Sequence, residues 1–187
     1  MTTRGMAFTL FWVAVGLALP PPASAYEGQN TLEGGAAYTA MPGDNGAQHF
    51  MGIDLAVGFG LGDAWSLRVS GAFAMGLVSD HQAADALARV GVEAIYLVDI
   101  VQLVPYLGVG IAAELLIGDD VSPHSAVASS LALHPALLAV VGLDYLLNRS
   151  IFIGAAYRMG WLPLYSERAG SPLHHSVDLR VGWRWDR

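Results

Sequence analysis

Eight stretches of this sequence alternate apolar and polar residues with a period of two, and in most of them the polar row carries a charge. Successive side chains of an extended strand point to opposite faces, so each stretch has two different faces. The predicted strands are Leu32–Met41, Phe50–Leu61, Trp65–Leu77, Ala88–Leu97, Pro105–Leu116, His134–Leu146, Ile151–Trp161 and Ser176–Trp185. Each reaches the ~9 to 11 residues that a tilted strand needs to cross a bilayer. The pattern predicts an all-β fold, an eight-stranded antiparallel transmembrane β-barrel.

The first twenty-five residues have the pattern of an export signal and are set apart from the fold. Arg4 supplies a positive start, Met6–Leu19 is an uncharged apolar segment, and Ala23-Ser24-Ala25 is a small-residue cleavage pattern. We expect a signal peptide over residues 1–25, cleaved before Tyr26, and one barrel domain over residues 26–187. An uncleaved membrane anchor is the alternative, but the apolar segment is shorter than the ~20 residues of a spanning helix.

The amino-acid composition argues against an ordinary soluble domain, a cysteine-based metal site and a nucleic-acid-binding protein. Only 13% of the residues are charged, against about 25% in an ordinary soluble domain, as expected where half of each strand faces hydrocarbon. The chain has no cysteine, so neither disulfides nor thiolate metal sites are available. Its net charge of −7 argues against a nucleic-acid partner.

The predicted connections alternate in length. Short turns are expected at Gly62-Asp63, Val98–Gln102 and Asn148-Arg149, and polar, mostly longer loops at Pro42–His49, Ser79–Asp85, Gly118–Ser130 and Ser166–His175. Bacterial barrels have short periplasmic turns and long extracellular loops, so we expect the long loops to lie outside the cell.

The two rows of each strand predict which residues face lipid and which face the lumen. In the second strand Met51 to Phe59 would point outward at alternate positions, and in the fifth strand Leu107 to Leu115 would do the same. The inward row would then contain the charges Glu33, Asp54, Arg68, Arg89, Glu93, Glu114, Asp144, Arg158, Asp178, Arg180 and Arg184. Charges in so narrow an interior persist only when paired, which predicts a salt-bridged, largely closed lumen. The alternative is a narrow ion pathway, since many inner residues are Gly or Ala.

Aromatic residues gather toward the ends of the predicted strands. The set near the turns is Phe59, Trp65, Tyr96, Tyr145, Trp183 and Trp185, and the set near the long loops is Tyr38, Phe73 and Trp161. Amphipathic rings favour the headgroup region, which predicts two interfacial girdles. Ordinary β-propensity, which also enriches aromatic residues in strands, is the alternative.

Two segments resemble a known class of membrane proteins. The strand opening Val104-Pro105-Tyr106-Leu107-Gly108-Val109-Gly110 resembles the Pro-Tyr-Leu-Gly-x-Gly segment of OmpA-like and OmpW-like small outer-membrane barrels. The closing strand from Val177 to Trp185 resembles the C-terminal signal that the barrel-assembly machinery reads, although Asp186 and Arg187 follow the final aromatic residue. The resemblance implies the outer membrane of a Gram-negative bacterium, export through the general secretory pathway, and contact with outer-membrane lipids and lipopolysaccharide.

The six histidines are the candidate residues for metal binding or catalysis. His49, His81, His124, His134, His174 and His175 all fall in or beside the predicted long loops. Imidazoles with nearby carboxylates can bind zinc or transfer protons, but only where they converge, and no local spacing enforces convergence here. The adjacent pair His174-His175 would point to opposite faces of a strand. We expect solvated loops without enzymatic activity, cofactor or metal; metal or proton sensing and catalysis are the alternatives.

The sequence therefore predicts a structural or surface-interaction protein, with an extracellular ligand of the loops as a further partner. One alternative is transport of small hydrophobic compounds, which the OmpW-like resemblance allows. That function needs an apolar lumen near the outer end, whereas the inner rows are read as Gly, Ala and charge. A second alternative is a soluble, exported lipocalin-like barrel with the faces reversed, apolar inside and charged outside.

Overall fold

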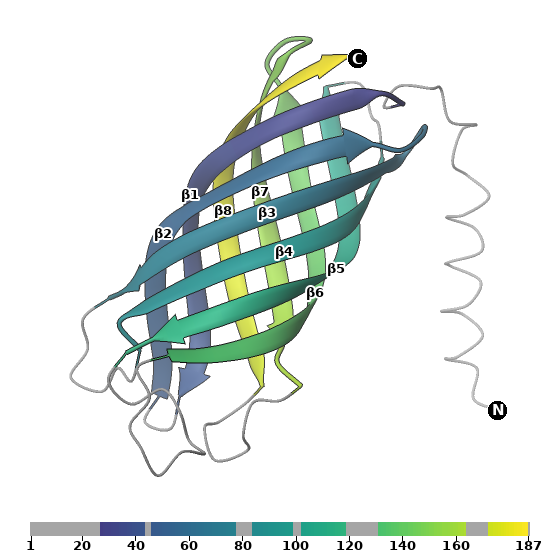
Figure 1. Ribbon diagram of the computed structural model, residues 1–187. Helices are drawn as coiled ribbons and strands as arrows, with labels where there is room; N and C mark the ends of the chain where they lie inside the picture. Colours follow the sequence, from purple (N-terminus) through teal and green to yellow (C-terminus); the bar gives the residue numbers. More distant parts are fainter. Residues whose placement is uncertain are drawn as a thin grey trace, which may run out of the picture.

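A computed structural model describes residues 27–43, 46–77, 84–98, 102–118, 131–163 and 172–186. The strands are β1 (Gln29–Gly43), β2 (Gly46–Gly60), β3 (Trp65–Gly76), β4 (Ala86–Leu97), β5 (Leu103–Ile117), β6 (Leu131–Leu146), β7 (Ile151–Trp161) and β8 (Leu173–Asp186). Each strand pairs antiparallel with the next, and β8 pairs with β1, so the sheet closes into a barrel of tilted strands (Figure 1). The predicted fold class is confirmed. Within the described part of the chain, no helix has the length and apolar character needed to span a membrane.

The strand boundaries agree with the prediction to within a few residues, except at the first connection. We expected a polar loop over Pro42–His49, but β1 and β2 stay paired to the end of the hairpin, where Gly43 lies opposite Gly46. The error arose because polar residues were read as a loop, whereas the backbone ladder continues through them. The predicted signal peptide lies outside the described residues and remains a prediction.

The barrel has two different ends. The connections at residues 61–64, 98–102 and 147–150 lie at one end, here called the turn end, together with the end of β8. The connections at residues 44–45, 77–85, 118–130 and 162–172 lie at the other, here called the loop end. Apart from the tight first hairpin, the predicted alternation of short and long connections is confirmed.

The two faces of the sheet are opposite in character. Outward residues such as Val109 and Ile111 are 65% and 64% exposed, whereas the inward Glu93 and Glu114 are fully buried. The outward and inward rows predicted for β2 and β5 are confirmed. A lipocalin-like barrel requires the reverse arrangement, so the structure does not support that alternative.

Small inward residues allow the strands to close around a narrow lumen. At Gly52 an added Cβ would lie 1.9 Å from the carbonyl oxygen of Phe73 on β3, and at Gly35 it would lie 2.0 Å from that of Leu179 on β8. Neither position has room for a side chain. The wall therefore needs glycine at these two positions. The space inside the barrel is filled by the few long side chains that point into it.

Candidate functional site

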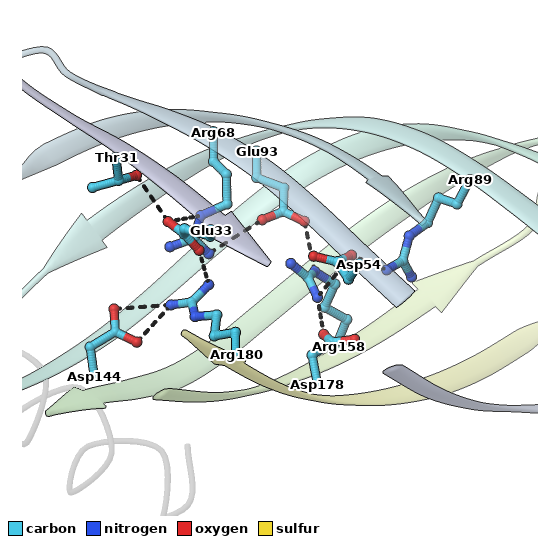
Figure 2. A network of polar contacts seen from close by, with 10 residues as sticks. All are labelled: Thr31, Glu33, Asp54, Arg68, Arg89, Glu93, Asp144, Arg158, Asp178 and Arg180. Carbon is cyan, nitrogen blue, oxygen red and sulfur yellow. Dashed lines mark hydrogen bonds and ion pairs between the residues drawn. The ribbon is translucent and has the colours of Figure 1, made fainter. Parts of the chain in front are cut away.

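Nine charged residues of the lumen form a continuous set of ion pairs (Figure 2). Toward the turn end, Glu33 of β1 contacts two arginines, Arg68 of β3 at 3.4 Å and Arg180 of β8 at 2.6 Å. The hydroxyl of Thr31 donates a 3.0 Å hydrogen bond to the same carboxylate. Arg180 also donates to both oxygens of Asp144, at 2.8 and 3.0 Å. These contacts join strands β1, β3, β6 and β8 across the lumen.

A second group of contacts fills the middle of the barrel. Arg158 of β7 donates a 2.8 Å hydrogen bond to Glu93 of β4, binds Asp178 of β8, and lies 3.9 Å from Asp54 of β2. Asp54 is also 3.3 Å from Arg89. Arg68, 3.7 Å from the second oxygen of Glu93, links this group to the turn-end group. Arg158 is 1% exposed, so its guanidinium has exchanged water almost entirely for carboxylates.

The aromatic ring of Tyr106 lies close to two of the arginines. The guanidinium carbons of Arg68 and Arg180 lie 5.0 and 4.8 Å from its centroid, and Arg180 is also 5.9 Å from the ring of Phe152. Cations over the face of an aromatic ring are attracted by its quadrupole, most strongly where water is excluded. The rings therefore add to the stabilisation that the carboxylates give these arginines.

Ten of the eleven residues predicted to form the luminal charge network are buried, and Arg184 differs from them. It lies at the turn end, where its Nε donates a 2.7 Å hydrogen bond to the carbonyl oxygen of Arg149 in the β6–β7 turn. It borders a small pocket of about 50 Å³, together with Glu33, Arg68 and Asp144. The pocket therefore connects the ion pairs with the mouth of the barrel at the turn end.

At the loop end the lumen is mainly apolar, which corrects our reading of the inner rows as Gly, Ala and charge. The larger buried apolar side chains there are Met41, Phe50, Leu87, Leu116, Leu138 and Leu162. The sequence-based prediction assigns inward residues only as far as the charged residues of each row, and these apolar side chains lie beyond them. Leu116 is two residues beyond Glu114 and Leu87 two residues before Arg89, so the same alternation places both of them inside.

The loop end also contains a contact that the sequence did not predict. His174 of β8 is fully buried, and its Nε2 lies 3.0 Å from Oε1 of Glu114 on β5. His134 of β6, also buried, is the cross-strand partner of Glu114. Both histidines had been expected in or beside solvated loops. Their sequence positions alternate in phase with the luminal residues Ser176 and Ala136, and that phase was the available signal.

The outward histidines have a different environment. His175 and His49 each lie 2.6 Å from a tyrosine hydroxyl, that of Tyr157 and of Tyr38 respectively, and each ring stacks on its tyrosine. His174 and His175 point to opposite faces, as expected. Among the described residues no three His, Cys, Asp or Glu side chains are gathered to hold a metal ion. His81 and His124 lie outside the described residues.

Aromatic residues line the outer wall at both ends. Trp65 packs edge to face against Tyr96 with centroids 5.2 Å apart, and Trp183 lies 4.9 Å from Trp185, all at the turn end. Near the loop end Phe73 and Trp161 are 47% and 45% exposed. The two bands border an outward wall of aliphatic side chains, the arrangement that suits the two interfaces of a bilayer.

A groove of about 520 Å³ indents the outer wall near the loop end, over β4, β5 and β6. Its lining includes Ile111, Ala113, Leu133 and Pro135. Pro135 lies beyond the last described β6–β7 pair, Leu137 with Trp161, so β6 has lost one neighbour at this point. The groove thus coincides with the part of the wall where strand pairing ends.

Comparisons with known proteins identify the fold. No protein-family model matches the sequence, and no curated protein matches it. Among solved structures, Neisserial surface protein A is 18% identical with a TM-score of 0.64, covering 86% of this chain and 100% of its own. The outer membrane protein OprG of Pseudomonas aeruginosa is 16% identical with a TM-score of 0.62, covering 87% and 98%.

A third neighbour is Ail, the attachment invasion locus protein of Yersinia pestis, solved in complex with the heparin analogue sucrose octasulfate. It is 18% identical with a TM-score of 0.59, covering 85% of this chain and 99% of its own. The chain thus has the fold of the small eight-stranded outer-membrane barrels, as the resemblance to OmpA-like and OmpW-like proteins implied. That the Pro105-Tyr106-Leu107-Gly108 segment is a sequence motif of this family remains a prediction.

Proposed function

We propose that this protein is an outer-membrane β-barrel protein of a Gram-negative bacterium, with a structural or surface-interaction role and a lumen that is closed at rest. The observation that carries the proposal is the distribution of side chains: the charges are buried and paired inside, and the aliphatic residues are exposed outside between two aromatic bands. A closed barrel satisfies its backbone hydrogen bonds internally, which a bilayer core requires. Water would not stabilise such an exterior.

The proposal includes a route to the membrane. Residues 1–25 direct export through the secretory pathway and are removed, and residues 26–187 form the barrel. The barrel-assembly machinery recognises the closing strand, whose aromatic residues Trp183 and Trp185 lie on the outer wall at the turn end. In this orientation the turn end faces the periplasm, and the loop end faces the cell exterior.

The partners follow from the two surfaces. Membrane lipids and lipopolysaccharide cover the outward wall, and the long connections at the loop end contact an extracellular ligand. The predicted loops contain one arginine, Arg168, and several carboxylates, including Asp80, Asp119, Asp120 and Glu167. Although Ail was solved with a sulfated heparin analogue, this charge balance favours a neutral or cationic ligand over a polyanion. The proposed role needs no cofactor and no catalytic residue.

Gel mobility tests the proposal directly. The protein is isolated from an outer-membrane fraction and run in SDS with and without boiling. We expect it to sediment with that membrane and to change apparent mass on boiling, because a closed barrel resists SDS until heated. Recovery from the soluble periplasm without a heat-dependent shift would contradict the proposal.

A second function, transport of small hydrophobic compounds, is favoured by the groove of about 520 Å³ and by the apolar lumen beside it. An Ala113→Trp variant places an indole in the groove, and Ala155→Trp adds the same side chain to the exposed face of β7. If the groove is an entry site, only the first variant will slow the uptake of an apolar fluorescent probe into proteoliposomes. Equal rates in both variants and the wild type would exclude this function.

A further inference from the structure

The loop end of the lumen is spanned by a contact between two titratable side chains. His174 Nε2 and Glu114 Oε1 are 3.0 Å apart, and each side chain is at most 1% exposed. Glu114 belongs to β5 and His174 to β8, strands that are not neighbours in the sheet. The contact therefore crosses the lumen. It links two strands that share no backbone hydrogen bonds with each other.

The surroundings of this pair contain few groups that can compensate a charge. The cross-strand partners of Glu114 are Arg89 on β4 and His134 on β6. His174 lies opposite Gly160 on β7, where an added Cβ would be 1.8 Å from the imidazole Cε1, so the ring fills the space that this glycine leaves.

Arg89 and His134 are thus the charged and titratable groups that face the pair from the neighbouring described strands. On the His174 side, β8 continues with Ser176, and β1 presents Thr39 and then Met41. The remaining large side chains at this end are the apolar residues Phe50, Leu87, Leu116 and Leu162.

The protonation state of the pair decides whether it is stable in this buried, mainly apolar part of the lumen. With one proton shared between them, an imidazolium and a carboxylate, or their neutral forms, carry no net charge, so the contact of 3.0 Å is electrostatically balanced. If the pair gains a further proton, it carries a net positive charge next to the guanidinium of Arg89 and the imidazole of His134. An uncompensated charge in an apolar interior is strongly unfavourable, and hydration by entering water relieves that cost.

We propose that Glu114 and His174 form a proton-operated closure, so that the lumen is shut in neutral medium and opens to water and small ions in acid. This inference rests on the proposed membrane location and adds an acid-activated conductance to it. In acid the carboxylate of Glu114 takes up one proton from the medium and the imidazole keeps its own. The step adds this proton to a carboxylate oxygen and breaks no covalent bond of the protein.

Polar groups continue from this closure to the turn end. Arg89, beside Glu114, lies 3.4 Å from the Ser176 hydroxyl and 3.3 Å from Asp54. From Asp54 the ion pairs continue through Arg158 and onward to Asp144, which borders the pocket at the turn-end mouth. Buried apolar side chains also lie toward the turn end, among them Ile95, Val104 and Phe152, but there they adjoin the ion pairs and the turn-end pocket. In the described part of the lumen, the apolar residues of the loop end are the ones that surround the proposed closure.

The test is conductance in planar bilayers of the purified, heat-modifiable protein in potassium chloride, as the pH is lowered from 7.5 to 4.5. We expect at least a threefold rise in conductance for the wild type. A Glu114→Leu/His174→Leu variant replaces the pair with apolar side chains, and a Glu114→Gln/His174→Gln variant replaces it with amides that do not titrate. Both are expected to keep the conductance of neutral pH throughout.

His175→Leu is the matched control, because it removes the adjacent imidazole from the outer wall and leaves the lumen intact. It should respond to acid as the wild type does. The inference is overturned if inserted wild-type protein shows no rise, if either folded double variant keeps the wild-type response, or if His175→Leu loses it. In all three cases the heat-modifiable insertion would still support the membrane location. Failure of the wild type to insert would overturn both proposals.

Discussion

Replacing Arg158 by methionine tests whether the luminal charges stabilise one another. The guanidinium binds Asp178, donates to Glu93 and lies 3.9 Å from Asp54, so the variant affects three carboxylates at once. Two of them keep an arginine: Asp54 is 3.3 Å from Arg89, and Glu93 is 3.7 Å from Arg68.

Asp178, at 1% exposure, loses the arginine that it binds and becomes a buried, uncompensated charge. Removing one partner of a buried ion pair typically costs about 3–5 kcal/mol, and we expect Arg158→Met to lower the free energy of unfolding by that amount.

The assay is equilibrium unfolding in urea from phosphatidylcholine vesicles, followed by tryptophan fluorescence and by the heat-dependent gel shift. Arg184→Met is the matched control, because that guanidinium donates to a main-chain carbonyl at the turn-end mouth, and its loss should cost less than ~1 kcal/mol. A double variant, Arg158→Met with Asp178→Leu, removes both charges of the closest pair and should recover at least half of the loss. The reasoning is refuted if the two single variants are equally stable, or if the double variant recovers nothing.

Two further pairs of substitutions test the packing of the lumen and the wall. Gly160→Ala forces the His174 ring away from its present position and should lower the unfolding free energy in the same assay by more than ~1 kcal/mol, as overpacking usually does, whereas Gly62→Ala in a turn meets nothing within 4 Å and should be neutral. An arginine in place of the outward Val109, midway along β5, should cost about 2–4 kcal/mol, and one in place of Leu131 at the loop end of β6 about 0–1 kcal/mol. Similar losses at Val109 and Leu131 would show that the wall does not face hydrocarbon.

The sequence predicted the faces of the strands well because the side-chain period of a strand is fixed at two. Once the strand from Pro105 to Leu116 is recognised, Tyr106 and Glu114 must share one face and Val109 the other. The same rule placed the luminal charges on one face before any partner was known. It depends only on local geometry, and errors of one or two residues at strand ends do not change it.

The partners of the luminal charges were not predictable in this way. Arg158 contacts Glu93, and Glu114 contacts His174, across the width of the barrel. Such contacts depend on the tilt and stagger with which the sheet closes, and alternation along a single strand contains no information about either. The prediction for His174 was wrong for a related reason: polar residues beyond the last apolar alternation favour a loop in the sequence, whereas the strand begins at Leu173 and includes His174.

The pairing of β1 with β8 has a consequence for how the chain acquires its structure. The first and last strands form one seam, in which Gly35 lies opposite Arg180, so the ladder is complete only when the last strand has been synthesised. The ion pairs between Glu33 and Arg180 and between Arg158 and Glu93 have the same requirement for distant partners. Contacts of such long sequence separation form late and make folding slow. A nascent sheet therefore exposes an unpaired edge and unneutralised charges until the seam forms, and a chain shortened before β8 is expected to aggregate or be degraded rather than persist as a smaller barrel.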